Sequence, residues 1–89
     1  MTYRIEIDRQ ALKVLAALPK KVQRQIATRI DSLAKEPFPS DAQQTEGQQE
    51  IWRIRSGSYR IAYTVRKNIL CILVLHIGDR KDFYRHFNR

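Results

Sequence analysis

The chain has little cysteine and no long apolar segment, and each shortage excludes a class of protein. Cys71 is the only cysteine, so no disulfide can form within the chain. It lies in an apolar run, where we expect an inert buried thiol and a reducing environment. No stretch is long enough to be a signal peptide or a membrane span. The sequence therefore predicts a cytoplasmic protein with no membrane partner.

Acidic residues are scarce as well. The chain has 17 Lys and Arg against 9 Asp and Glu, a formal net charge of +8 in 89 residues. A charge of this size favours a polyanionic partner, although basicity can also serve solubility alone. With 43% hydrophobic and 29% charged residues, the composition is typical of a folded protein. The length allows one hydrophobic core, so we expect a single domain over residues 1–89.

The first half of the chain predicts one strand and two helices. Residues 3–7 alternate between apolar and polar side chains, as a strand does, and Asp8 can cap a helix directly after it. Pro19 interrupts, and a second helix is expected over residues 20–35. The apolar residues expected on the two buried helix faces are Ala11, Leu12, Leu15 and Leu18, then Val22, Ile26, Ile30 and Leu33.

The second half predicts a loop and then a sheet. Residues 37–49 have no apolar periodicity and are expected to form a connecting loop. Three β-rich runs follow, separated by short turns: 50–55, 58–66 and 69–77. The last run is apolar from 69 to 75, which is typical of a central strand covered on both faces. We therefore expect an α+β fold with an N-terminal strand, a helical hairpin and a three-stranded antiparallel meander.

Arginines are concentrated on one face of the expected β-hairpin. A two-residue turn at Ser56-Gly57 places Arg53 opposite Arg60 and Arg55 opposite Ser58. The apolar residues fall on the other face: Trp52, Ile54, Tyr59, Ile61 and Tyr63. Opposed arginines repel each other, which favours an anion between them, and the arginine fork suits phosphate oxygens. The alternative is a solvated face that happens to be arginine-rich.

Beyond the last strand, residues 78–80 predict a turn that leaves the sheet. Arg80 and Tyr84 can then stand beside the arginine-rich face. An aromatic ring next to a phosphate clamp commonly stacks an unpaired base. The alternative is that Tyr84 and Phe87 only seal the edge of the core.

Three segments together resemble the signature of the RelE/ParE toxin superfamily. They are Trp52-Arg53-Ile54-Arg55, Gly57-Ser58-Tyr59-Arg60-Ile61-Ala62-Tyr63, and Ile77-Gly78-Asp79-Arg80 through Tyr84. The resemblance implies a microbial RNase-like fold and a toxin of a type II toxin–antitoxin pair. It further implies a RelE-type endonuclease that needs no metal or cofactor and cuts messenger RNA on the ribosome by attack of the 2′-hydroxyl. An acidic, RelB-like antitoxin is the implied partner, besides the ribosome and messenger RNA.

The resemblance also implies the roles of individual residues. Arg53 and Arg60 would hold phosphate, and Arg55 would stabilise the transition state. Arg80 would assist the leaving 5′-oxygen, and Tyr84 would stack the base or act as general base. Some family members carry lysines where this chain has Arg53 and Arg55. Arginine has a pKa above about 12, which suits charge stabilisation better than proton transfer.

Two histidines complete the set of candidates. His76 ends an apolar strand and is expected to be a structural residue at the edge of the core. His86 is a candidate auxiliary residue near Tyr84. Two rival functions stay open: a ParE-like toxin that inhibits gyrase, and a nucleic-acid-binding module without enzymatic activity.

Overall fold

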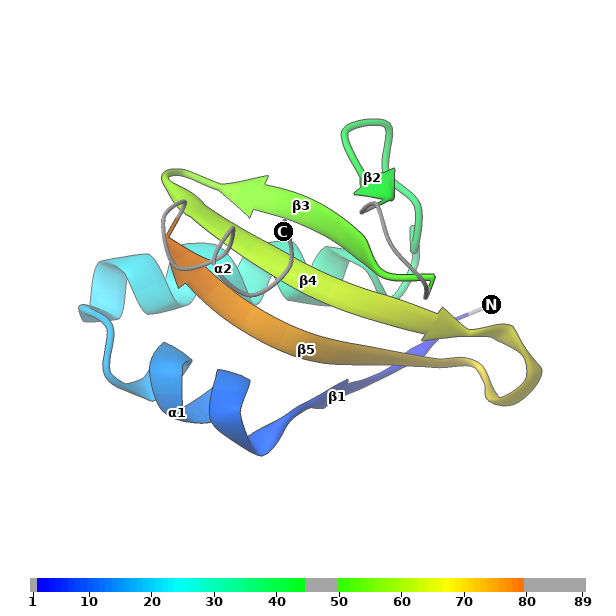
Figure 1. Cartoon of the computed structure of the whole chain (residues 1–89), viewed down its shortest axis with the longest axis horizontal. Coiled ribbons are helices and arrows are strands. Elements are labelled where there is room, and N and C mark those ends of the chain that lie inside the picture. Colours follow the sequence, from blue (N-terminus) through cyan, green and yellow to red (C-terminus); the bar gives the residue numbers. More distant parts are fainter. Residues whose placement is uncertain (1, 45–49, 80–89) are drawn as a thin grey trace.

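The computed structural model describes residues 2–44 and 50–79 (Figure 1). The apolar periodicity of the sequence predicted β1 and both helices, and a continuous apolar run predicted the last strand. The elements, in chain order, are β1 (Arg4–Ile7), α1 (Arg9–Ala16), α2 (Lys20–Ser32), β2 (Gln43–Gln44), β3 (Trp52–Ser56), β4 (Tyr59–Arg66), a short 3-10 turn (Lys67–Ile69) and β5 (Cys71–Asp79).

The strands form one five-stranded sheet in the order β1-β5-β4-β3-β2. Strands β3, β4 and β5 are the predicted antiparallel meander, and β1 runs parallel to β5 at one edge. Figure 1 shows α2 running behind the sheet, and the two helices contribute to the same buried cluster. The predicted α+β class is confirmed. The loop predicted over residues 37–49 is wrong in one respect, because Gln43 and Gln44 pair with β3 at the other edge.

The helices begin as predicted, but the apolar face of the first is narrower than expected. The side chain of Asp8 accepts a hydrogen bond from the backbone N–H of Gln10 at 3.0 Å and so caps α1. Ala11 is buried, whereas Leu12 is 51% exposed, so its predicted place on the buried face is wrong. Successive side chains of a helix point about 100° apart, so Leu12 turns away from the core when Ala11 faces it. Helix α2 ends at Ser32, three residues before the predicted end.

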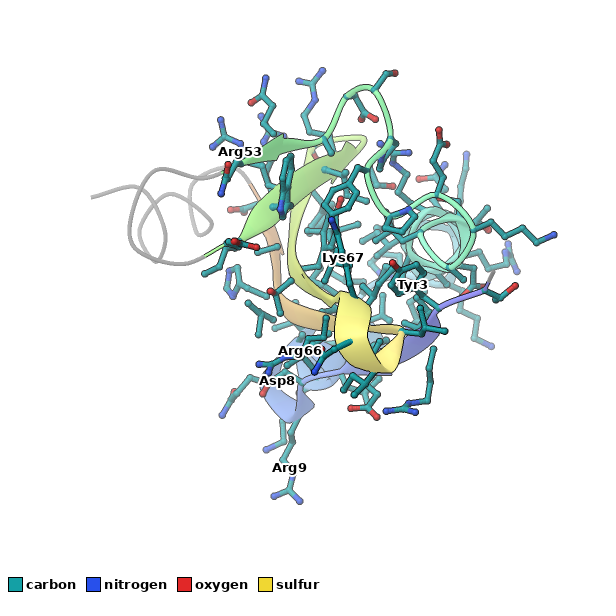
Figure 2. The ribbon with its side chains drawn as sticks, turned by 90° about the vertical axis from the view of Figure 1, so that its right-hand side faces the viewer. Tyr3, Asp8, Arg9, Arg53, Arg66 and Lys67 are labelled. Carbon is teal, nitrogen blue, oxygen red and sulfur yellow. The ribbon has the colours of Figure 1, made fainter. Side chains whose placement is uncertain are left out.

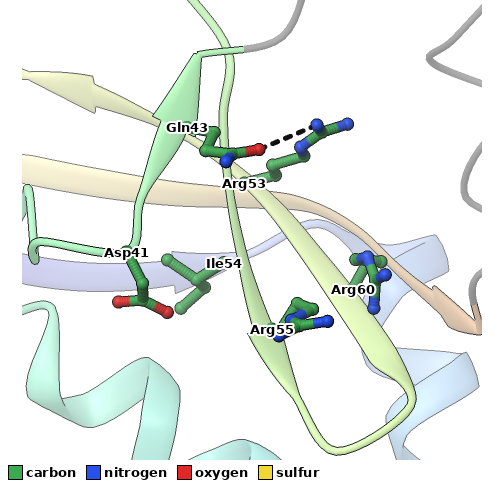
Figure 3. A pocket seen from close by; sticks show the side chains of 6 residues that line it. All are labelled: Asp41, Gln43, Arg53, Ile54, Arg55 and Arg60. Carbon is green, nitrogen blue, oxygen red and sulfur yellow. Dashed lines mark hydrogen bonds between the residues drawn. The ribbon is translucent and has the colours of Figure 1, made fainter.

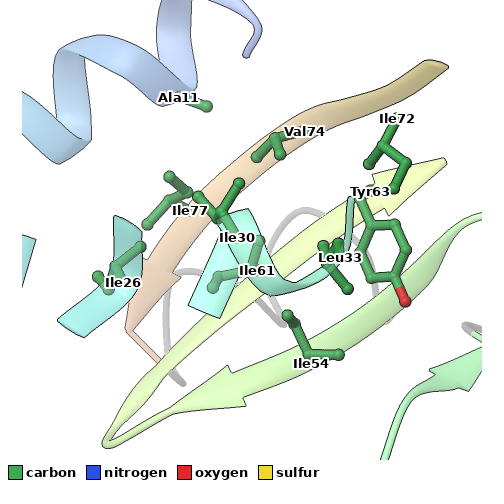
Figure 4. Packing of buried hydrophobic residues seen from close by; sticks show 10 residues of the cluster. All are labelled: Ala11, Ile26, Ile30, Leu33, Ile54, Ile61, Tyr63, Ile72, Val74 and Ile77. Carbon is green, nitrogen blue, oxygen red and sulfur yellow. The ribbon is translucent and has the colours of Figure 1, made fainter. Parts of the chain in front are cut away.

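The core lies between the helices and one face of the sheet (Figure 4). Helix α1 contributes Ala11, helix α2 contributes Ile26 and Ile30, and Leu33 follows directly after α2. The sheet contributes three fully buried residues of the β3–β4 hairpin and three of β5: Ile54, Ile61, Tyr63, Ile72, Val74 and Ile77. The hydroxyl of Tyr63 donates to the backbone oxygen of Pro37 at 2.7 Å, and burial raises the pKa of Tyr63 to about 12. The predicted apolar face of the hairpin is confirmed.

Strand β5 lies inside the sheet, between β1 and β4, as its apolar sequence predicted. It starts at Cys71, two residues later than expected, because the 3-10 turn and Leu70, with a φ of 50°, form the connection. It also continues to Asp79, so the turn predicted over residues 78–80 is wrong for Gly78 and Asp79, which pair with β4. A register shift beside Ala62 leaves one residue of β5 without a partner in β4.

The turn of the β3–β4 hairpin lies one residue later than predicted. Gly57 has a φ of 61° and Ser56 faces Tyr59, so the two turn residues are Gly57 and Ser58. A glycine with positive φ at the first turn position is what a type II′ turn requires. The predicted partners are therefore wrong: Arg55 lies opposite Arg60. The predicted faces are nevertheless confirmed. Moving the turn by one residue changes the partner of each position by two residues, and side chains two residues apart point to the same face.

Candidate functional site

Three arginines, Arg53 and Arg55 of β3 and Arg60 of β4, share the face of the sheet that the helices leave uncovered. We call them the arginine cluster. They line a pocket of about 370 Å³ together with Asp41 and Gln43 (Figure 3). Arg55 is exposed and the other two arginines are half-buried, so the guanidinium groups are accessible to a ligand.

The pairing of Arg55 with Arg60 is the central feature of the cluster. Directly opposed like charges destabilise a sheet by several tenths of a kcal/mol, up to about 1 kcal/mol. Neither guanidinium forms an ion pair with a carboxylate among residues 2–44 and 50–79. An anion bound between the two strands would relieve the repulsion and accept hydrogen bonds from both forks.

Strand β2 orients the third arginine. Gln43 lies opposite Arg53, and its side-chain oxygen accepts a hydrogen bond from Nη2 of Arg53 at 2.9 Å. Sequence reasoning missed Gln43, because two strand residues in a polar segment show no periodicity. The one sequence feature that could have indicated Gln43 is its place in the polar segment before the hairpin.

An ion pair beneath the cluster joins three parts of the chain. Arg29 of α2 donates from Nε to the backbone oxygen of Arg55 at 3.0 Å, and its Nη2 contacts the carboxylate of Asp41. The hydrogen bond from Arg29 holds the pKa of Asp41 below its ordinary value. Helix α2 and the segment before β2 are therefore both tied to the end of β3. Sequence reasoning missed Arg29, because nothing in the local pattern of α2 distinguishes it from the other cationic residues of the helix.

The structure brings together three of the predicted site residues, Arg53, Arg55 and Arg60. Arg80, Tyr84 and His86 lie outside the described residues, as does Phe87. His76 is half-buried in β5, opposite Ala62.

Residues 2–44 and 50–79 contain no group of three or more His, Cys, Asp or Glu side chains placed to hold a metal ion. Neither helix of this part has the length and apolar character needed to cross a membrane.

Comparison with known proteins places the chain in a family. A family model described as the ParE toxin of type II toxin–antitoxin systems matches residues 5–84. The chain belongs to the RelE/ParE toxin family. RelE1 of Methanocaldococcus jannaschii is 28% identical over 89 residues, which cover 97% of this chain and 99% of that protein. The family predicted from the hairpin motifs is thus confirmed, and the protein is a toxin of a type II toxin–antitoxin system.

Solved structures of RelE toxins have the same fold. A chain of the archaeal RelE–RelB complex from Pyrococcus horikoshii superimposes with a TM-score of 0.76 and is 33% identical, covering 90% of this chain and 97% of that one. A mutant E. coli RelE in the free state gives a TM-score of 0.76 at 24% identity, over 92% of this chain and 87% of that one. A chain of the RelBE2 complex from Mycobacterium tuberculosis gives 0.79 at 18% identity, over 90% and 100%. The last two establish the fold alone.

Proposed function

We propose that this toxin is a RelE-type endoribonuclease that cuts messenger RNA on the ribosome and so inhibits translation. The observation that carries the proposal is the pair of opposed arginines, Arg55 and Arg60, at the mouth of an open pocket on the uncovered face of the sheet. This is an arrangement that concentrates positive charge where a phosphodiester can enter.

The proposed chemistry uses the RNA as its own nucleophile. The 2′-hydroxyl attacks the adjacent phosphorus, the 5′-oxygen of the next nucleotide leaves, and a 2′,3′-cyclic phosphate remains. The protein then has to position the strand and stabilise the extra negative charge on the phosphate oxygens. Arg53 and Arg60 bind phosphate in this scheme, and Arg55 stabilises the transition state. No metal ion is required for these steps.

The remaining roles are assigned by motif position in the family. Arg80 neutralises charge on the leaving 5′-oxygen, and Tyr84 stacks the base or takes the 2′-proton. His86 is an auxiliary residue beside them. Arginine is a poor proton carrier, so Tyr84 is the proposed group for general base catalysis.

A RelE-type activity is favoured over a ParE-type inhibitor of gyrase by two observations. The relative from P. horikoshii, at 33% identity, is a RelE–RelB complex, and the M. jannaschii relative also has the RelE name. The arginine cluster suits a phosphate group, which supports an enzyme that acts on RNA. A passive binder would need the charge but not the opposed pair with its supporting contacts.

The proposed partner in the cell is an acidic, RelB-like antitoxin. RelE relatives occur in complexes with RelB. A chain with a net charge of +8 attracts an acidic segment, and such a segment would hide the arginines from RNA. The complementary charge would also speed association.

The test is cleavage of message on ribosomes by the purified protein, with Tyr84 as the diagnostic position. We expect cutting to fall in the order wild type, Tyr84→Phe, Tyr84→Ala, with ribosome binding nearly unchanged because that affinity rests on the arginines. The products should carry a cyclic or 3′-phosphate, and a chelator should not stop the reaction if the ribosomes stay intact. A wild-type protein that cuts nothing and stalls gyrase would establish the ParE alternative.

A further inference from the structure

A second hollow lies on the other side of β2 from the arginine cluster. Gln43 lines the pocket of the cluster, while its neighbour Gln44 lines this second hollow of about 590 Å³. Its walls combine two aromatic rings with polar and cationic residues from the end of β4 and the turn after it: Phe38, Trp52, Arg66, Lys67 and Asn68. We call it the aromatic cleft. Figure 2 views the molecule from this end, with Arg66 and Lys67 labelled at the turn.

The two aromatic rings form a rigid platform. The ring centroids of Phe38 and Trp52 are 4.9 Å apart with an interplanar angle of 62°, an edge-to-face contact. Trp52 packs against the core from β3, which fixes the platform to the sheet. Phe38 is 39% exposed and is one of four large apolar residues that are exposed in the described part of the chain. An exposed ring held in place by a half-buried one can stack a planar ligand with little loss of entropy.

Cations stand beside the platform. Nζ of Lys67 lies 5.5 Å from the ring centroid of Phe38, and Arg66 and Asn68 flank it in the chain. Within residues 2–44 and 50–79, the carboxylates that form ion pairs are Glu6 and Asp41, so neither Arg66 nor Lys67 has an acidic partner there. Among the described residues that line the cleft, Glu50 is the one carboxylate against these two cations. This described lining has a net positive charge and an aromatic wall.

We propose that the aromatic cleft binds one unpaired nucleotide of an RNA strand, with the base on Phe38 and the phosphate at Arg66 and Lys67. A stacking ring beside a cationic groove is the usual way in which proteins hold single strands without reading their sequence. Lys67 leaves the ring and moves to the phosphate when the base enters. This deepens the proposed function, because the RNA that enters the arginine cluster would be the strand held here.

The spacing along β4 fits such a strand. Arg60 of the cluster and Arg66 of the cleft are six residues apart on the same strand, which is about 20 Å at the rise of a β-strand. Trp52 lies on the face of the sheet opposite to the arginine cluster, so the RNA would pass around the edge formed by β2, and a few extended nucleotides can span that length. The cleft therefore holds a nucleotide that flanks the cut and is not itself cleaved.

Trp52 is the only tryptophan of the chain, so its fluorescence reports on the cleft directly. The probe is a 2′-O-methyl oligoadenylate hexamer, which cannot be cut because it lacks the attacking hydroxyl. We expect saturable quenching by the hexamer and little quenching by an abasic strand of the same length and charge. Circular dichroism and thermal melting of each variant check that it is folded.

Three variants separate the cleft from the cluster. Phe38→Leu, which keeps an apolar side chain but removes the stacking ring, should weaken binding by about fivefold or more and reduce the quench. Lys67→Ala should weaken binding several-fold and lower the salt dependence. Arg60→Ala should also weaken binding of the hexamer but leave the full quench at saturation, because Arg60 belongs to the arginine cluster and not to the aromatic cleft.

Several outcomes would overturn the proposal. Equal quenching by the abasic strand, or by polyglutamate of the same charge, would make the cleft a general anion or protein surface. Folded Phe38→Leu and Lys67→Ala proteins that titrate like wild type would do the same. The proposed function is tested separately. Cleavage on ribosomes without quenching by the hexamer would contradict only the nucleotide site in the cleft. Quenching without cleavage would contradict only the proposed endonuclease activity.

Discussion

The two faces of the β3–β4 hairpin are built from alternating residues of the same short segment, yet they obey different rules. Ile54, Ile61 and Tyr63 point to the helices and are almost completely buried. Arg53, Arg55 and Arg60 point away from the helices and line an open pocket. The first face contributes stability through the removal of apolar area from water. The second opposes like charges, which lowers stability in the absence of a ligand.

This difference means that a single hairpin allows stability and activity to be changed separately. Substitutions on the core face should act on folding and reduce activity only by unfolding the protein. Substitutions on the arginine face should act on activity and leave the fold intact or slightly more stable. Variants on the two faces can test that separation.

Truncation of Tyr63 should have the largest effect on stability. Tyr63→Ala removes a fully buried ring and should lower the free energy of unfolding by about 3–5 kcal/mol. Tyr63→Phe loses only the hydrogen bond to the backbone oxygen of Pro37 and should cost about 1 kcal/mol. Urea unfolding followed by circular dichroism measures both. A Tyr63→Ala protein that is as stable as wild type but inactive would place Tyr63 in the site and reverse the two faces.

Removal of Arg29 should reduce activity indirectly, through the position of Arg55. Arg29→Ala breaks the contacts that tie α2 and Asp41 to the end of β3, so we expect Arg55 to lose its fixed position and message cleavage to fall by about tenfold. Arg29→Lys keeps the charge but cannot make both contacts in the same geometry, and should recover only part of the activity. The matched control is Arg24→Ala on the exposed surface of the same helix. If Arg29→Ala and Arg24→Ala cut equally well, the ion pair does not position Arg55.

The smallest expected effect is the pH dependence of stability at Asp41. Arg29 lowers the pKa of the folded carboxyl below that of the unfolded chain, so the stabilisation is present above the ordinary pKa of 3.8 and is lost as the pH falls through the lower folded value. Wild type should therefore lose more stability than Asp41→Asn between pH 5 and pH 2. Thermal melts of the two proteins over this range give the comparison. Parallel curves would show that the ion pair does not contribute to stability.

The same contrast explains how much of the molecule could be predicted from its sequence. The strand at residues 4–7, both helices and the apolar face of the hairpin follow from local periodicity, and the structure confirms them. The family followed from motifs in the hairpin and from a third motif that begins in the last strand, and the family model confirms it. Local pattern was sufficient wherever one face of an element is buried.

The details of the site depend on contacts between distant segments, and these were missed. Strand β2 exists because Gln43 and Gln44 can pair with the edge of β3, not because of any pattern of their own. Arg29 lies 26 residues from the backbone oxygen that it contacts, so no local signal marks it. The partners within the hairpin were wrong because Ser56-Gly57 and Gly57-Ser58 are both acceptable turns from sequence. Only the structure shows that Arg55 faces Arg60.

We expect the opposed pair of Arg55 and Arg60 to bind phosphate and to lower the stability of the unliganded fold. The most direct test compares Arg60→Ala with Arg24→Ala, which lose the same charge, in cleavage of ribosome-bound message and in thermal unfolding. We expect Arg60→Ala to cut about 10²-fold more slowly and to melt at the wild-type temperature or slightly above it, because the repulsion has been removed. Arg24→Ala should cut like wild type. An Arg60→Ala protein that cuts at the wild-type rate, or that unfolds, would contradict the claim.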